Sequence, residues 1–160
     1  MEGLIASGLD ALGLTGGVPR QAPTLLDRYG EELLAKNQVM NLTAITDPQD
    51  VATLHMLDCA PLLECGRFIG KTLIDVGTGA GFPGMVLKIL VPSLEVTLLD
   101  SLQKRLAWLE ELSVDLGLSG LTFLHGRAEE EGQDPALRER FDFAAARAVG
   151  VASPVFAICF

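Results

Sequence analysis

Four glycines fall within ten positions between Asp75 and Gly84, in the sequence DVGTGAGFPG. Apolar runs flank this segment, TLI before it and MVLKIL after it. A glycine-rich turn between a strand and a helix brings the backbone close to a ligand, because no Cβ stands in the way. The segment is therefore a candidate binding loop, and the charges around it decide which ligand it takes.

One interpretation of the loop is a dinucleotide site. Gly79, Gly81 and Gly84 fit the G-x-G-x-x-G template, and Asp100, at the end of the next apolar run, could bind a ribose. Against this, Asp75 ends the first apolar run, where its carboxylate would repel a pyrophosphate. Pro83 also removes a backbone N–H from the start of the helix. A nicotinamide-dependent oxidoreductase stays an alternative.

A ligand of the opposite charge suits the loop better. S-adenosylmethionine carries a sulfonium and an ammonium group and no phosphate, so Asp75 could attract its methionyl end directly or through water. Gly77, Gly79 and Gly81 would let the backbone approach, and Asp100 could accept hydrogen bonds from both ribose hydroxyls. The sequence therefore predicts a methyl-donor site.

The elements that must position these residues alternate along the chain. Strands are predicted at TLIDV, EVTLLD, LTFLHG and FDFAAARAV, with helices at GMVLKILV and over residues 101–117. This order predicts a mostly parallel, Rossmann-like α/β sheet, which we assign to residues 69–160. Because the sequence reaches Phe160 soon after the fourth strand, we expect an incomplete sheet with an unpaired edge and further C-terminal strands missing.

The residues before this core divide into two segments. Residues 1–22 are small and punctuated by glycine, and are predicted to form a loosely ordered leader. From Pro23 onward, apolar residues between Leu25 and Val39 recur at helical spacing. Thr46 or Asp47 could then cap a second helix. Residues 23–68 are thus predicted to form an N-terminal helical extension.

Composition narrows the class of protein. The chain has 160 residues, of which 49% are hydrophobic, and this suffices for one globular domain. A net charge of −9 argues against sequence-independent binding to nucleic acid. No segment resembles a secretory signal or a membrane span, and the three cysteines lack metal or redox spacing. We expect reduced cysteines, a cytoplasmic protein, and neither metal nor membrane as a partner.

Short motifs follow one another along residues 24 to 150: NLTAITDP, HMLDC, DVGTGAGFPG, LLDSLQKR, GRAEE and ARAV. Their order and spacing resemble the bacterial small-subunit ribosomal RNA guanine-N7 methyltransferases, also called the glucose-inhibited division protein B family. The resemblance implies a class I methyltransferase fold and methyl transfer from S-adenosylmethionine to N7 of the guanine at position 527 of 16S rRNA. It also implies that the cofactor contacts Gly77, Phe82, Asp100, Ser101, Leu102, Ala128, Glu129 and Arg147.

The implied reaction sets limits on the catalytic residues. Guanine N7 has a free lone pair and no proton to lose, so we expect no obligatory general base. The rate would come from alignment of the reactants and exclusion of water. His55 and Asp58, one helical turn apart, could lie on the substrate side or tie the second helix to the sheet. The expected partner is the small ribosomal subunit and the expected state a monomer; a non-catalytic remnant that still binds S-adenosylmethionine is the other alternative.

Overall fold

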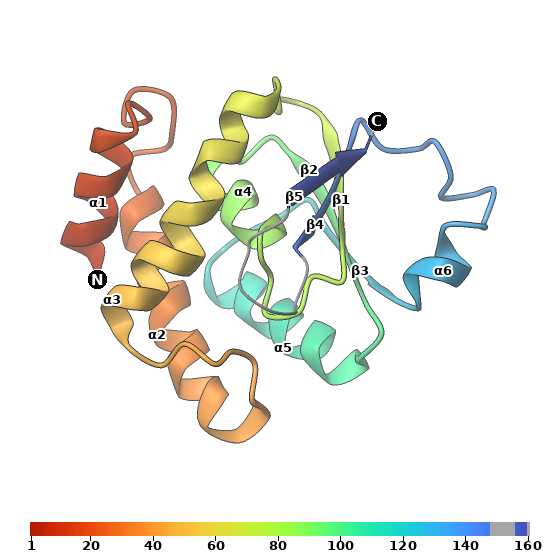
Figure 1. The fold of residues 1–160 in the computed structure, drawn as a ribbon, viewed down its shortest axis with the longest axis horizontal. Helices are drawn as coiled ribbons and strands as arrows, with labels where there is room; N and C mark the ends of the chain where they lie inside the picture. Colours follow the sequence, from red (N-terminus) through yellow and green to blue (C-terminus); the bar gives the residue numbers. More distant parts are fainter. Residues whose placement is uncertain (148–155, 160) are drawn as a thin grey trace.

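A mostly parallel sheet forms the centre of the computed structural model, which describes residues 1–147 and the backbone of residues 156–159 (Figure 1). Its strands lie in the order β3-β2-β1-β4-β5. They are β1 (Thr72–Val76), β2 (Glu95–Asp100), β3 (Leu121–His125), β4 (Phe143–Arg147) and β5 (Phe156–Cys159). Strands β1 to β4 pair in parallel, so their carboxyl ends meet at one edge of the sheet. The predicted α/β class is confirmed.

Helices connect the parallel strands as the alternating sequence pattern predicts. Helix α4 (Gly84–Leu90) joins β1 to β2, and α5 (Gln103–Asp115) joins β2 to β3. Every residue of α4 is buried, because the N-terminal helices cover the side of α4 that faces away from the sheet. Its sequence is apolar on every side except for Lys88, and this reflects burial on all sides.

The edge of the sheet beside β4 differs from the prediction. We expected an unpaired edge after the fourth strand, but β5 pairs with β4 in the antiparallel sense, with Ala144 opposite Cys159. The terminal apolar residues thus supply the backbone partners that β4 would otherwise lack. Residues 148 and 149 of the predicted fourth strand lie outside the described residues, as does the side chain of Cys159.

Most of the chain before the sheet, as far as residue 65, is helical. Helix α2 (Ala22–Met40) is followed by one continuous helical stretch made of α3 (Pro48–Asp50), a π-helical turn η1 (Val51–Met56) and a 3₁₀ segment η2 (Leu57–Cys65). Asp47 caps this stretch, because its carboxylate accepts from the backbone N–H groups of Gln49 and Asp50. The predicted cap is confirmed.

The prediction that the first residues form a loosely ordered leader is wrong for residues 2–11. They form helix α1 (Glu2–Ala11), which buries Ile5 and Leu9 completely or nearly so. Gly8 lies so close to Leu57 that a Cβ would overlap its side chain, so α1 packs directly on η2. In contrast, Val39, which the helical spacing placed on the apolar face of α2, is 77% exposed.

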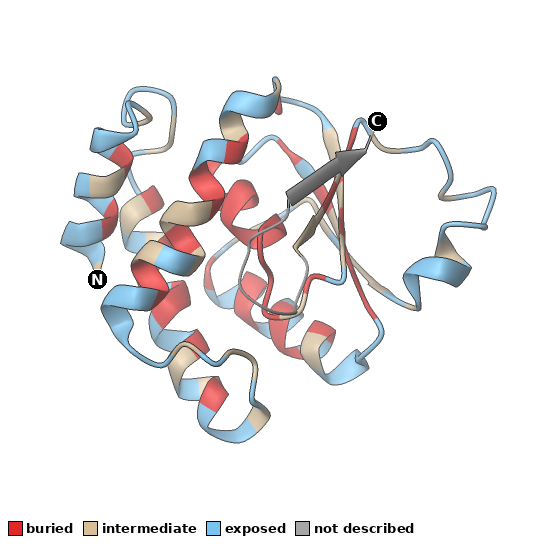
Figure 2. Ribbon diagram, in the orientation of Figure 1, coloured by how far each residue is buried: buried red, intermediate tan, exposed pale blue. Residues whose placement is uncertain are grey.

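Buried residues concentrate between the N-terminal helices and the sheet, whereas the short helix α6 (Ala128–Glu131) buries none of its residues (Figure 2). The largest fully buried side chains include Tyr29 of α2, Met56 of η1 and Leu87 of α4. The helical extension and the sheet therefore share one core. Within the residues that the structure describes, no helix is long and apolar enough to cross a membrane.

Candidate functional site

The glycines of the loop after β1 have two different roles. Gly77 and Gly79 have φ angles of +69° and +60°, and a Cβ on Gly77 would meet no atom of the described residues within 4 Å. Gly81 and Gly84 are packing positions, because a Cβ there would overlap Met85 and Leu109 in one case and Asp75 and Leu98 in the other. Gly77 and Gly79 line the hollows described below, whereas Gly81 lines neither of them.

Asp75 is buried beneath this loop, and its carboxylate contacts the loop itself. Its side chain has no exposed surface, and its Oδ2 accepts from the Thr78 hydroxyl at 2.6 Å and the Gly84 N–H at 2.8 Å. Its Oδ1 has no hydrogen-bond partner among the residues that the structure describes. Burial raises the pKa of this carboxyl to about 6, although the bonds from Thr78 and Gly84 oppose the rise. Asp75 therefore holds the loop against helix α4.

The start of helix α4 has few donors left for a phosphate. Pro83 has no N–H, Gly84 donates to Asp75, and the N–H of Met85 donates to the carbonyl of Gly81. A dinucleotide site uses the first N–H groups of this helix to hold the pyrophosphate. The local hydrogen bonds thus disfavour a dinucleotide for a reason that the sequence did not reveal.

A hollow of about 250 Å³ lies at the carboxyl ends of β1, β2 and β3; we call it the β2 hollow. It brings together five of the predicted cofactor residues, namely Gly77, Asp100, Ser101, Ala128 and Glu129. The remaining lining residues are Val76, Leu99, Gly126 and Arg127. Leu102 does not line this hollow; its backbone N–H bonds Asp100, and its side chain is 41% exposed.

Asp100 is the buried carboxylate of the β2 hollow, with 4% of its surface exposed. Its Oδ2 accepts from the N–H of Gly79 at 2.8 Å, and its Oδ1 accepts from the N–H of Leu102 at 2.9 Å. Arg105 lies 3.7 Å from Oδ2. Each carboxylate oxygen has two lone pairs, so Asp100 keeps capacity to accept from a ligand's hydroxyl groups while the protein fixes its orientation.

A second hollow, of about 300 Å³, lies on the other side of Gly77; we call it the arginine hollow. It is lined by Leu42, Thr43, Ala44, His55, Gly77, Thr78, Gly79, Ala80, Phe82, Arg105 and Arg147. Arg105 and Arg147 are the only charged side chains among these lining residues. Although the chain is acidic overall, this hollow therefore favours an electron-rich or anionic ligand.

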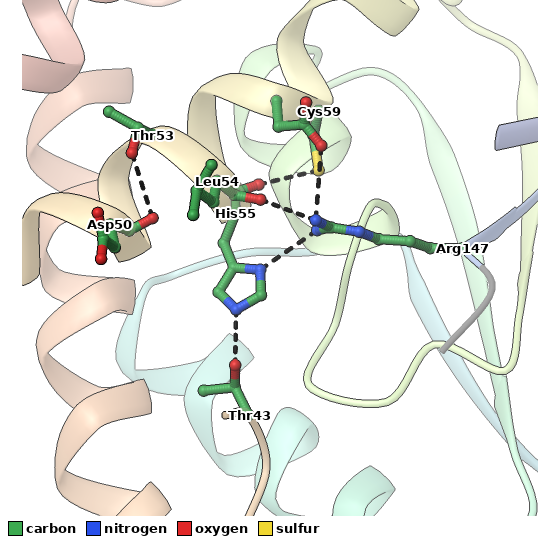
Figure 3. A network of polar contacts seen from close by, with 8 residues as sticks. Thr43, Asp50, Thr53, Leu54, His55, Cys59 and Arg147 are labelled. Atoms are coloured by element: carbon green, nitrogen blue, oxygen red, sulfur yellow. Dashed lines mark hydrogen bonds and ion pairs between the residues drawn. The ribbon is translucent and has the colours of Figure 1, made fainter. Parts of the chain in front are cut away.

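Arg147 is held at the arginine hollow by several groups of the helical extension (Figure 3). Its guanidinium donates to the carbonyl of Leu54 at 2.7 Å, contacts His55 Nδ1 at 3.2 Å and lies 3.5 Å from the Asp58 carboxylate. The predicted substrate-side pair, His55 and Asp58, thus converges on a predicted cofactor residue. Asp58 itself does not line the hollow.

His55 is an uncharged histidine. Burial, and secondarily the charge of Arg147, lowers its pKa to about 4. Its ring stacks on Phe82 with centroids 4.5 Å apart, and Phe82 stacks in turn on Tyr29 at 5.2 Å. The Tyr29 hydroxyl donates to the carbonyl of Ala80, so this aromatic column also anchors the glycine loop. Phe82 is 5% exposed and lies between the rings of Tyr29 and His55.

Sequence reasoning missed Thr43 and Arg105 as residues of the site. Thr43 belongs to the NLTAITDP motif and Arg105 to LLDSLQKR, so both lay within quoted motifs. Their chemistry was not visible, because it depends on a loop between α2 and α3 folding over the glycine turn and on the first turn of α5 facing Asp100.

Comparisons with known proteins identify the family of this chain. A family model described as "GidB: rRNA small subunit methyltransferase G" matches residues 23–160. The chain belongs to this family. The ribosomal RNA small subunit methyltransferase G of Alkaliphilus metalliredigens is 47% identical to it over 133 residues, which make up 82% of this chain and 55% of that protein. The protein of the same name from Streptococcus thermophilus is 51% identical over 125 residues, 76% of this chain and 52% of its own length.

This member of the GidB family spans about half the length of the curated relatives it matches. Among solved structures, a mutant of MtNAS in complex with S-adenosylmethionine matches 94% of the chain and 52% of its own length, with a TM-score of 0.51 and 16% sequence identity. At that identity the likeness concerns the fold alone. The sequence-based resemblance to the family is confirmed, and the match includes the motifs that carry the two hollows.

Proposed function

We propose that this chain binds S-adenosylmethionine and transfers its methyl group to N7 of a guanine in 16S ribosomal RNA. The observation that carries the proposal is the β2 hollow, where five residues expected to contact the cofactor converge in a member of the methyltransferase G family. The proposal extends to the guanine at position 527, which the family resemblance implies. The small ribosomal subunit is the proposed partner.

The residues of the β2 hollow fit the adenosine part of this cofactor. Asp100 is oriented by two backbone donors and retains lone pairs for ribose hydroxyls, and Ala128 and Glu129 line the far side of the hollow. Gly77 lines both hollows, and the open space beside its Cα leaves room for a ligand that passes from one to the other. When bound, the cofactor would supply an electrophilic methyl group on a sulfonium.

The arginine hollow fits the accepting base. Its neutral His55 and its two arginines add no negative charge that would compete for the methyl group. Both ring nitrogens of His55 are engaged, one by Arg147 and one by Thr43, so His55 has no free site from which to remove a proton. This supports the expectation that no general base takes part, because N7 of guanine needs none.

The nicotinamide alternative has less support. The N–H groups that would bind a pyrophosphate are occupied or absent at the start of α4, and the family match concerns methyltransferases. The monomeric state, the cytoplasmic location and the absence of a metal stay predictions.

Methyl transfer from radiolabelled S-adenosylmethionine to small ribosomal subunits from a strain lacking this modification tests the proposal. We expect label in the RNA, and 7-methylguanosine as the product in mass spectrometry of the digested nucleosides. Label in another nucleoside would contradict the proposed acceptor atom, and absence of label would contradict the activity of this chain.

A further inference from the structure

The hydroxyl of Thr43 carries a hydrogen to which the proposed function assigns no acceptor. Thr43 lies in the loop after α2 and lines the arginine hollow. Its backbone is fixed by Asn37, whose side-chain amide donates to the Thr43 carbonyl and whose side-chain oxygen accepts from the Thr43 N–H, both at 2.9 Å. Asn37 is itself 9% exposed, and this pair of hydrogen bonds holds the backbone of Thr43 beside the hollow.

Arg147, His55 and Thr43 contact one another in sequence, and Arg147 determines which of their polar atoms carry hydrogens. A guanidinium has only donors, so the contact to His55 Nδ1 makes that nitrogen the acceptor. The neutral imidazole then carries its hydrogen on Nε2, which lies 2.7 Å from the Thr43 Oγ1 and donates to it (Figure 3).

Thr43 Oγ1 also accepts from the backbone N–H of Ile45 at 3.1 Å. A hydroxyl oxygen has two lone pairs, and both are now occupied. Its own hydrogen must therefore be donated elsewhere, and no acceptor for it is found among the residues that the structure describes. Since Thr43 lines the arginine hollow, this hydrogen is available to an acceptor on a ligand that enters the hollow.

We propose that the Thr43 hydroxyl is a specificity-determining donor to the O6 carbonyl of the accepting guanine. The inference rests on the proposed function. Guanine O6 is the acceptor beside N7, and adenine carries an amino group at that position, which cannot accept this hydrogen. Arg147 fixes the tautomer of His55, and His55 donates to the Thr43 hydroxyl. Toward the base, the Thr43 hydroxyl can therefore only donate, and this distinguishes guanine from adenine.

The test combines substitutions on both partners. Thr43→Val removes the hydroxyl and keeps the side-chain shape, whereas Thr43→Ser keeps the hydroxyl. We expect Thr43→Val to lower single-turnover methyl transfer to small ribosomal subunits by about tenfold or more, because a donor to the substrate is lost. Thr43→Ser should retain the wild-type rate, and the affinity for S-adenosylmethionine should stay unchanged in both variants.

Thr43→Val also removes an acceptor for His55 and Ile45, so the contact is tested from the RNA side as well. Small subunits reconstituted with 2-aminopurine at the accepting position retain N7 and lack O6. The wild-type chain should lose about tenfold in rate on this substrate, and Thr43→Val should lose nothing further.

The outcomes separate this inference from the proposed function. Equal rates for the wild type and Thr43→Val, or additive losses from the protein and RNA changes, would overturn the role of Thr43 alone. Weaker binding of S-adenosylmethionine by Thr43→Val would assign the hydroxyl to the cofactor and also overturn it. Failure of the wild-type chain to methylate unmodified subunits would overturn the proposed function and this inference with it.

Discussion

For Asp75, the sequence predicts the position of the backbone but not the direction in which the side chain points. Its position at the end of β1 was predicted correctly, and from that position a charge facing the ligand was expected. In the structure the carboxylate turns under the loop, toward Thr78 and Gly84. The strand register fixes where the Cα lies, but the choice between the ligand and the loop depends on the donors that the loop presents, which no periodicity reveals.

The burial of Asp75 predicts a pH dependence of stability. Its pKa of about 6 lies above the ordinary value of 3.8, so between these values the native state binds a proton that the unfolded state has lost. The free energy of unfolding should therefore fall as the pH rises from about 4 to about 6, by an amount on the order of 2 kcal/mol. Asp75→Asn keeps an acceptor for Thr78 and Gly84 and should lose this slope.

Urea unfolding across that pH range measures the slope for both chains. Asp115→Asn, at an exposed position on α5, is the matched control and should keep the wild-type slope. An unchanged slope in Asp75→Asn would mean that the buried carboxylate does not change its protonation state in the native protein.

Among the elements, β1, β2 and α4 were predictable because their apolar runs are short and are bounded by glycine or proline, and α5 because its apolar residues recur at helical spacing. Helix α1 was not predicted, because many of its residues are small and its charged residues show no helical periodicity. Its stability comes from tertiary packing, with Ile5 and Leu9 buried and Gly8 against Leu57. Likewise, antiparallel β5 arises from backbone pairing with β4, which the sequence of either segment does not specify.

Two glycines at opposite ends of β1, Gly70 before it and Gly77 after it, have the same backbone conformation. Gly77 and Gly70 have φ angles of +69° and +68°, and a Cβ on either would meet no atom within 4 Å. Replacement by alanine should cost each about 1 kcal/mol in stability, because both φ angles are unfavourable for a side chain. Gly77 lines both hollows, whereas Gly70 precedes the opposite end of β1.

Gly77→Ala should therefore weaken binding of S-adenosylmethionine by at least about tenfold, because the Cβ of the new alanine occupies space that the ligand needs. The control variant Gly70→Ala should bind S-adenosylmethionine with the wild-type affinity. Thermal unfolding establishes that the two variants are equally stable, and calorimetry compares their affinities. Equal affinities would place the cofactor away from Gly77.

In the whole molecule, the sheet topology brings the β2 hollow and the arginine hollow together, although their residues lie in separate motifs of the sequence. Parallel β1, β2 and β3 bring their carboxyl ends to one edge and form the β2 hollow. The helical extension carries Thr43 and His55 to that edge, where β4 supplies Arg147. The net charge of −9 thus coexists with a local hollow whose charged lining residues are arginines, and composition alone could not locate it.

The central claim is that the β2 hollow binds S-adenosylmethionine through Asp100. Isothermal titration of the chain with this cofactor tests it most directly, with Asp100→Ala as the variant and Glu110→Ala, an exposed carboxylate on α5, as the matched control. We predict one binding site in the wild type and in Glu110→Ala, no detectable binding in Asp100→Ala, and no binding of NAD. Absence of binding to the wild type, or equal affinity in Asp100→Ala, would contradict the account.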